Sequence, residues 1–363
     1  MQLSDIIGND AARRALEGMV ESGRIPNALL FYENDGCGAL PMALAFLDAV
    51  YGHDRKVSRL VHPDIHFIFP VASSTKVEGK VSELVPDAFL EYWRELVSEN
   101  PYFLENELSS ALGIEGKSSA INVRTANQIL SVLSLTPVER GYKSVLIYLP
   151  EKMNDQAANK LLKAVEEPPE KTFFLMITHA PDRVIPTISS RCQGIRVLPS
   201  EAGEVASVLV RDFDKGEEEA AEAAAVSGGS VGVALDHLSE RKDYGVWMDL
   251  FSDLAEALIG RDLAGALDCG ERMASLPSRE KQKAFCKFAS ECLGKIFLIR
   301  QGLPGLAVVG EDEKEFYASV SARFKASFPR RAAAAFDRAA NLIGRNVNQK
   351  MVFCDLVDRL FLI

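Results

Sequence analysis

Residues 33–40, ENDGCGAL, are the stretch of this 363-residue chain that comes nearest to a chemical device. They lie between an apolar run, ALLFY (28–32), and a helix-like stretch that starts at Pro41. A glycine-rich turn between a strand and a helix is where a phosphate-binding loop belongs, because backbone N–H groups and the helix N-terminus attract anions there. The lysine and the hydroxyl residue that such a loop needs do not follow Gly38. The turn is therefore either a nucleotide site without its chemistry or an ordinary turn.

The segments around this turn alternate between strand and helix patterns, as in α/β domains. Pro41 suits the first helical position, because its missing N–H would have no intrahelical partner there. The continuous apolar run SVLIYL (144–149) is typical of a parallel strand covered on both faces. We expect strands over 28–32, 65–69, 144–149, 172–178 and 195–198, helices over 9–21, 41–50, 155–166 and 181–189, and helical spacing from 123 to 133.

Three parts follow from the pattern along the chain. An α/β domain over 1–199 is interrupted at 70–120 by an insertion with at least one helix, to which the sequence assigns no task. Short helices over 201–210, 217–226 and 231–238 predict a small helical domain over 200–240. Amphipathic stretches and the helix former AAAAFDRAANLIG (332–344) predict an all-α C-terminal domain over 241–363.

Composition excludes several classes of protein. Hydrophobic residues make up 47% and charged residues 25%, as in soluble globular proteins. No apolar run approaches the roughly 18 residues that span a bilayer, and the N-terminus lacks the pattern of a signal peptide. The net charge of −10 argues against a protein that coats nucleic acid by itself. Residues 1–240 carry 22 Lys and Arg against 35 Asp and Glu, and residues 241–363 carry 19 against 16, which suggests a boundary near 240.

The cysteines give no metal or disulfide signal. None of the six forms a Cys-x-x-Cys pair, so neither a zinc site nor a disulfide framework is expected. A reducing cytoplasm is the simplest location for such a chain.

Three stretches together resemble the bacterial clamp-loader branch of the AAA+ ATPases. They are IIG (6–8) with RIPNALLF (24–31), then NKLLKAVEEPP (159–169), and then IPTISSRCQ (185–193). The order and spacing of the "LLKxxEEPP" and "SRC" segments are highly specific. The resemblance covers residues 1 to about 240 outside the insertion, and more loosely the rest. It implies an AAA+ fold, a P-loop type parallel sheet with flanking helices, followed by a helical lid and a helical collar domain.

The chain departs from the family's nucleotide-binding pattern at three positions of the phosphate loop. An active member has Gly-x-x-Gly-x-Gly-Lys-Thr/Ser here. Aligned on Gly36 and Gly38, this chain has Glu33 at the first glycine, Ala39 at the lysine and Leu40 at the hydroxyl. Each charged hydrogen bond is worth about 1.5–3 kcal/mol, so nucleotide affinity should fall by roughly two or more decades. Glu33 adds a negative charge near where phosphates would lie.

The second half of the implied site is also changed. The strand that ends in Asp-Glu in active members ends here in Leu149-Pro150, which removes the metal-holding and water-activating carboxylates. The lid's sensor arginine would fall at Gly232 or Val233. Thr178 matches a phosphate-sensing position and should be idle. We therefore expect no bound cofactor and no ATP hydrolysis by this chain.

The triplet Ser190-Arg191-Cys192 is intact. In the resembled family its arginine projects at the ATP held by a neighbouring subunit, an effect of about 10³–10⁵ in rate, or roughly 4–7 kcal/mol. An arginine at a helix C-terminus can instead pair with the helix dipole or a nearby carboxylate. The surrounding motif favours the role in trans.

Other candidates are weaker. His62-Pro63-Asp64 resembles the segment that follows the zinc-binding cysteines of many relatives, but residues 51–61 contain no cysteine, so we expect no metal and read His62 as a turn residue. Residues 159–167 could face a partner subunit or DNA, although Leu161, Leu162 and Val165 fit a core stripe. Arg323-Phe324-Lys325 and Arg330-Arg331 fit a solvated helix face better than a nucleic-acid site.

The resemblance implies a non-catalytic subunit of the replicative DNA polymerase III clamp loader. Its implied partners are the loader's ATPase subunits and clamp-opening subunit in a hetero-oligomer, with the sliding clamp and primer-template DNA reached through the complex and no membrane. Two alternatives stay open. One is an ATPase whose weak, unorthodox nucleotide site uses the amides of Gly36 and Gly38, and the other is an AAA+ scaffold of another hetero-oligomer.

Overall fold

The computed structural model describes residues 2–79, 83–139, 141–303, 306, 307, 309, 313–345 and 347–363. The chain forms two compact units, Met1–Leu238 and Ser239–Ile363. Each unit has its own hydrophobic core.

The first unit is built on a five-stranded parallel sheet. Its strands are β1 (Ala28–Tyr32), β2 (Ile65–Ile68), β3 (Lys143–Tyr148), β4 (Thr172–Thr178) and β5 (Gln193–Arg196), and they lie in the order β2-β3-β4-β1-β5. In register, Ala28 pairs with Phe174, and Val145 pairs with Phe174 from the other side. Every residue of β3 and β4 is buried, which confirms the expectation that the apolar runs are parallel strands covered on both faces.

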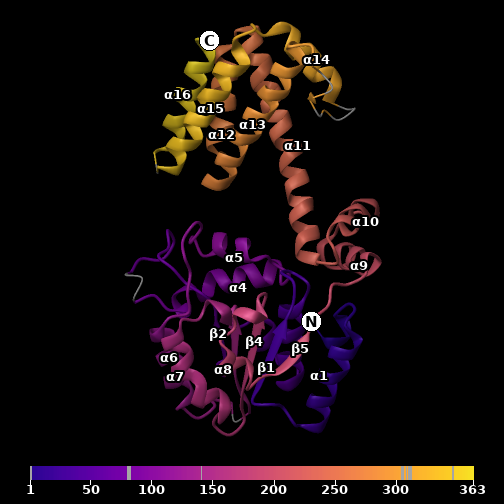
Figure 1. Cartoon of the computed structure of the whole chain (residues 1–363), viewed down its shortest axis with the longest axis vertical. Coiled ribbons are helices and arrows are strands. Elements are labelled where there is room, and N and C mark those ends of the chain that lie inside the picture. The colour runs from indigo at the N-terminus through magenta and orange to yellow at the C-terminus, as the bar shows by residue number, and fades with distance from the viewer. Residues whose placement is uncertain are drawn as a thin grey trace. The chain divides into compact units, whose positions relative to one another are not determined.

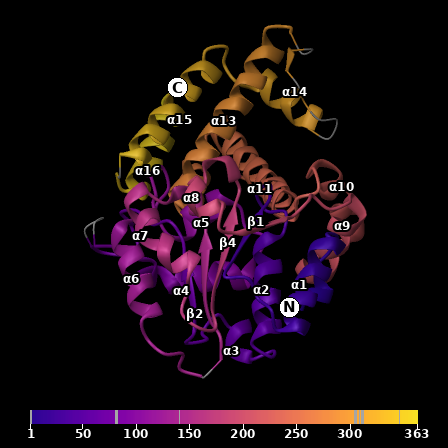
Figure 2. The same cartoon turned by 60° about the horizontal axis from the view of Figure 1, so that its bottom comes forward.

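Helices cover both faces of this sheet (Figures 1 and 2). Alternate residues of β4 separate the two cores, since Phe173 and Leu175 join one cluster and Phe174 and Met176 join the other. The first cluster holds residues of α1, α2, α4 and α5, and the second holds residues of α6, α7 and α8. The helices of these layers are α1 (Asp10–Ser22), α2 (Ala39–Val50), α3 (Arg55–Ser58), α4 (Leu90–Glu99), α5 (Glu105–Ala111), α6 (Val123–Leu133), α7 (Asp155–Glu166) and α8 (Pro186–Ser189), with 3₁₀ helices η1 (Leu3–Asp5), η2 (Pro86–Phe89), η3 (Pro150–Lys152) and η4 (Pro181–Arg183).

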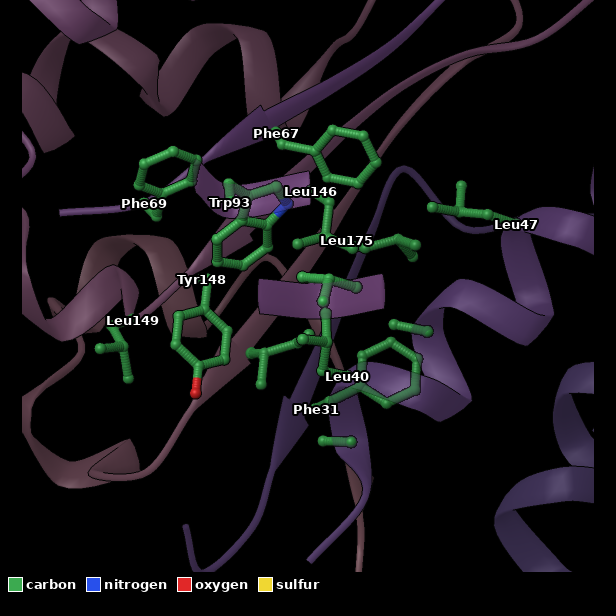
Figure 3. Packing of buried hydrophobic residues seen from close by; sticks show 14 of the residues in the cluster. Phe31, Leu40, Leu47, Phe67, Phe69, Trp93, Leu146, Tyr148, Leu149 and Leu175 are labelled. Atoms are coloured by element: carbon green, nitrogen blue, oxygen red, sulfur yellow. The ribbon is translucent and has the colours of Figure 1, made fainter. Parts of the chain in front are cut away.

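The segment that interrupts the α/β alternation is tied into the first core. Val71 and Ala120 form an antiparallel bridge that closes its two ends. Trp93 on α4 is fully buried and stacks on Phe69, with ring centroids 4.6 Å apart. Its ring also lies 5.6 Å from that of Tyr148 on β3, and Figure 3 shows these side chains together. An aromatic side chain buries 150–250 Å², so the insertion contributes to the core of the α/β unit.

A small helical subdomain completes the first unit. It comprises α9 (Ala202–Phe213), α10 (Glu217–Val226) and the start of α11 (Val231–Gly260). Their buried apolar residues, together with Tyr102 of the insertion, form a separate cluster. These three helical segments, called the lid below, therefore pack on Tyr102 of the insertion.

The elements named in the described part of the second unit are all helices. The helices are the later part of α11, α12 (Leu263–Ala274), α13 (Arg279–Arg300), α14 (Lys314–Arg323), α15 (Phe328–Gly344) and α16 (Gln349–Phe361). Phe285, Phe336 and Phe353 are almost fully buried in their core. None of the helices in the described part of the chain is both long and apolar enough to cross a membrane.

The predicted fold class, a P-loop type parallel sheet with flanking helices and helical regions after it, is confirmed. Several boundaries were wrong. Helix α2 begins at Ala39, so Pro41 is its third residue, still in the first turn where an N–H needs no partner. The helix expected over 181–189 is divided into η4 and α8, because Pro186 disfavours a helical Ile185. The strand expected over 195–198 is β5, two residues earlier.

The helix expected over 231–238 continues without a break to Gly260. No proline interrupts this stretch, and the charge step near residue 240 marks no helix end. The change in charge balance near residue 240 therefore does not coincide with the end of α11 at Gly260.

Candidate functional site

The glycine-rich turn lies at the carboxyl end of β1, between β1 and α2. Strand β1 is flanked by β4 and β5, and ligands of open α/β sheets bind at the carboxyl ends of strands. Gly36 and Gly38 have φ angles of +73° and +115°, which glycine adopts without strain. The turn has the position and glycine geometry of a phosphate-binding loop, although its side chains differ.

Glu33 reaches the end of helix α2. Its carboxylate is buried, and Oε2 accepts a hydrogen bond of 2.8 Å from the backbone N–H of Ala39, the first residue of that helix. A helix N-terminus attracts anions because its first N–H groups lack intrahelical partners. The sequence predicted only a negative charge near this place. In the structure the Glu33 carboxylate accepts a hydrogen bond from the first residue of the helix.

The positions that would carry phosphate and metal chemistry are apolar. Ala39 and Leu40 are buried in the core of the unit. Leu149 follows β3 as a buried residue with a φ of +58°, and Pro150 begins η3. The next carboxylate, Glu151, accepts a 3.0 Å hydrogen bond from the backbone N–H of His179. The side chains at the five positions that depart from the pattern provide neither a cation nor a hydroxyl; these positions are Glu33, Ala39, Leu40, Leu149 and Pro150.

His179 completes this cluster, although no sequence motif pointed to it. Its Nε2 lies 3.6 Å from Glu33 Oε1, and its Nδ1 lies 3.4 Å from Asp35 Oδ1, so the protonated ring would form an ion pair with each carboxylate at distances longer than a short hydrogen bond. Burial lowers the pKa of His179, but Glu33, Asp35 and Glu151 raise it more, and the net pKa is above its ordinary value. Its position directly after β4, one residue past the end of the strand beside β1, was the signal available in the sequence.

Thr178 and Asp35 have structural partners. The Thr178 hydroxyl oxygen accepts a 3.1 Å hydrogen bond from the backbone N–H of Ala180. Burial raises the pKa of Asp35, while His179 lowers it, and the net pKa is raised. Asp35 Oδ2 accepts a 2.9 Å hydrogen bond from the backbone N–H of Glu105, the first residue of α5 in the insertion.

The lid also contacts the loop directly. The Ser230 hydroxyl donates to the carbonyl of Asp35 at 2.9 Å, and the Gly232 N–H donates to the carbonyl of Gly36 at 3.1 Å. A Cβ added at Gly232 would lie 2.3 Å from the carbonyl oxygen of Tyr102. Gly232 and Val233, the predicted sensor positions, lie in the first turn of α11. Gly232 packs against the backbone of Tyr102.

Arg191 lies on the surface in the turn between α8 and β5. Its Nε donates to Glu166 Oε2 at 2.9 Å, and its Nη1 donates to the carbonyl of Thr187 at 2.8 Å. These are the contacts expected of an arginine at a helix C-terminus beside a carboxylate. Among its neighbours, the Ser190 N–H donates to the carbonyl of Pro186, and burial raises the pKa of the Cys192 thiol to about 11.

His62 belongs to the one group in the described part of the chain whose three ligand atoms lie within 4.8 Å, with Asp54 and Glu139. Its Nδ1 accepts a hydrogen bond from the Asp64 N–H at 3.1 Å, so in the neutral ring Nε2 carries the proton and points it at Glu139, 3.3 Å away. The ammonium of Lys56 also contacts Glu139. This donor set does not fit a metal ion, because Nε2 has no free lone pair.

The remaining candidates have ordinary surroundings. Leu161 and Val165 are buried in the core and Leu162 packs against it, so α7 presents a core stripe to the sheet. In the basic stretch of the second unit, Arg323 pairs with Glu256 through contacts of 2.7 and 2.9 Å. Lys325 donates to the carbonyl of Ile363 at 3.4 Å. These contacts favour a solvated surface, but the helix face expected at Lys325 was wrong, because this residue lies in the turn between α14 and α15.

Comparison with known proteins agrees with the resemblance found in the sequence. A family model described as "DNA polymerase III, delta subunit" matches residues 8–201, more than half of the chain. The chain is 38% identical over 117 residues to the DNA polymerase III subunit delta' of Pseudomonas aeruginosa, and 44% identical over 78 residues to that of Yersinia pestis. These matches cover 32% and 22% of this chain, and only 36% and 23% of the relatives' own lengths.

Among solved structures, a gamma subunit-related protein from Thermotoga maritima aligns over 95% of this chain and 98% of its own, with 18% identity and a TM-score of 0.37. A score this low allows no transfer of functional detail.

Proposed function

Since this chain belongs to the DNA polymerase III delta subunit family, we propose that it is a non-catalytic subunit of the replicative clamp loader, of the delta-prime type. In this role it supports ATP-dependent loading of the sliding clamp without binding or hydrolysing ATP itself. It lends Arg191 in trans to ATP held by a neighbouring subunit, and it acts in the cytoplasm, where replication takes place.

The contact between Glu33 and the N–H of Ala39 is the observation that carries the first half of this proposal. A phosphate at the start of α2 would have to displace a buried carboxylate from the same N–H group. It would then meet neither a lysine nor a hydroxyl, because Ala39 and Leu40 stand at those positions. Binding of nucleotide would thus cost a charged hydrogen bond and return none of the usual side-chain contacts.

The exposure of Arg191 supports the second half. The side chains of Arg191 and Glu166 are 34% and 54% exposed, and surface ion pairs contribute about 0–1 kcal/mol. Releasing Arg191 from Glu166 therefore costs little compared with the roughly 4–7 kcal/mol that a trans arginine supplies to phosphoryl transfer. In this proposal Glu166 holds the guanidinium until a neighbouring subunit provides the phosphate.

The proposed partners are the loader's ATPase subunits and its clamp-opening subunit. The helices of residues 241–363 would form this chain's part of a collar that joins the hetero-oligomer. The sliding clamp and primer-template DNA are reached through the assembled complex. A chain with no nucleotide to bind cannot be moved by one, so the motion would come from its neighbours.

Reconstitution with the loader's ATPase and clamp-opening subunits tests the proposal. Arg191→Ala should leave the folded chain and the assembled complex intact, and should lower ATPase stimulated by clamp and DNA by tenfold or more. Arg183→Ala, an exposed arginine in the nearby η4, is the matched control and should have no effect. Unchanged ATPase with Arg191→Ala in a fully assembled complex would remove the trans arginine from the proposal.

The alternative of a scaffold in another hetero-oligomer predicts different partners. Affinity capture of the tagged chain from its native cell should recover the loader's ATPase subunits and its clamp-opening subunit. Recovery of a stable complex that lacks them would favour the alternative.

A further inference from the structure

The loop of residues 33–38 is the meeting point of three segments that are distant in the sequence. The lid reaches it through Ser230 and Gly232, whose hydrogen bonds end on the carbonyls of Asp35 and Gly36. The insertion reaches it through Glu105, whose N–H donates to the Asp35 carboxylate. Lid, insertion and α/β base are therefore joined at one short loop by hydrogen bonds of 2.9–3.1 Å.

Close packing surrounds the same loop. A Cβ at Gly36 would lie 2.8 Å from Leu104 Cδ2 and 3.0 Å from the Cα of Gly232. A Cβ at Gly38 would lie 3.3 Å from the ring of Tyr102. Side chains of the insertion thus lie against both glycines, the lid backbone lies against Gly36, and little space is left beside either.

Charges inside the cluster are arranged around Glu33. Its carboxylate accepts from the N-terminal N–H of α2 on one side and faces the ring of His179 on the other. The same ring faces Asp35, and Glu151 accepts from the His179 backbone N–H. A buried carboxylate is stable only when it is paired and hydrogen-bonded. Glu33 meets both conditions at the place where a bound anion would meet them.

We propose that the Glu33 carboxylate is a built-in anion that substitutes for a bound phosphate, and that loop 33–38 acts as a clasp that fixes lid and insertion on the base without nucleotide. A ligand that binds one conformation stabilises that conformation by mass action. Here the anion is covalently part of the chain, so its effective concentration does not depend on nucleotide supply. The clasp deepens the proposed function and rests on it, because it explains how a subunit without ATP keeps one lid position.

Hydrogen exchange of the full chain, followed by mass spectrometry, tests the clasp. Glu33→Ala removes the carboxylate and should increase the exchange rate of lid amides 227–236 and insertion amides 101–108 by about tenfold or more, the effect of losing one charged hydrogen bond. Glu33→Gln keeps size and one acceptor oxygen and should give a smaller increase. Glu21→Ala removes an exposed carboxylate of α1 and should give none.

Exchange of lid and insertion that stays within twofold of the wild type in a folded Glu33→Ala chain would overturn the clasp. If that variant does not fold, Glu33→Gln decides, because it removes only the negative charge and should still speed exchange in the lid but not in α7. Addition of Mg-ATP to the wild type separates this proposal from the proposed function. Slower lid exchange with Mg-ATP would contradict the absence of nucleotide binding, whatever Glu33→Ala does.

Discussion

Substitution of Gly36 by alanine measures how tightly the loop is packed, and Gly52 provides a matched control. Both glycines have a left-handed backbone, with φ angles of +73° and +66°. A Cβ at Gly36 would meet Leu104, Ser230 and Gly232 at 2.8–3.0 Å, whereas a Cβ at Gly52 would meet nothing within 4 Å. The two variants therefore share the backbone strain and differ in the overlap with lid and insertion.

The expected magnitudes follow from these two effects. An alanine in the left-handed region costs about 1–2 kcal/mol, which is the whole effect expected for Gly52→Ala. Overpacking adds about 1–3 kcal/mol, so Gly36→Ala should lower the free energy of unfolding by roughly 2–5 kcal/mol. With a urea dependence of about 2 kcal/mol per molar, the two midpoints should differ by about 0.5–1.5 M.

Urea unfolding followed by tryptophan fluorescence is the assay. The chain has two tryptophans, and a Trp247→Phe background leaves Trp93 as the reporter of the first unit. Both variants should unfold in a single transition of the same steepness, so that the midpoints compare free energies. Equal midpoints for Gly36→Ala and Gly52→Ala would refute the claim that lid and insertion are packed against the loop.

Three further predictions concern the same unit. The pKa of His179 is raised in the folded chain, so its imidazolium, which faces Glu33, Asp35, Glu151 and the ring of Tyr148, stabilises the fold fully below the unfolded pKa of about 6.5. Stability should be lost as pH rises through the raised folded value, and urea midpoints from pH 6 to 9 should fall for the wild type but not for His179→Gln; equal pH profiles would contradict this. Trp93→Ala leaves a cavity beside Phe69 and should destabilise the first unit by about 3–5 kcal/mol in circular-dichroism unfolding; a loss under 1 kcal/mol would mean that the insertion does not support the core. Glu166→Ala releases Arg191 from an exposed pair and should change stability by less than about 1 kcal/mol, with ATPase of the reconstituted complex retained; ATPase loss equal to that of Arg191→Ala would mean that Glu166 is needed to position the arginine.

Local patterns were sufficient to predict most of the elements. The bounds of β1, β4, α7 and α10 agree with the predicted ranges to the residue, because each has a clear apolar or helical period and recognisable ends. The length of α11 was not predictable in the same way, since its polar middle has neither periodicity nor a stop signal.

The contacts of the candidate site depend on tertiary structure. Asp35 meets Glu105 across 70 positions and Ser230 across 195 positions of the chain. No local pattern reports such pairings, so no role of the insertion could be predicted. Glu33 was identified as a departure from the family pattern, but its bond to Ala39 depends on the shape of the loop. His179 could have been found by asking which polar residue follows each strand at the edge that holds the loop.

Calorimetric titration of the full wild-type chain with Mg-ATP measures whether loop 33–38 binds nucleotide. We expect no heat of binding at nucleotide concentrations up to about 1 mM, because a buried carboxylate accepts from the N–H group of Ala39 and the lysine and hydroxyl positions are Ala39 and Leu40. Saturable binding in the micromolar range, with turnover of ATP by the isolated chain, would contradict it.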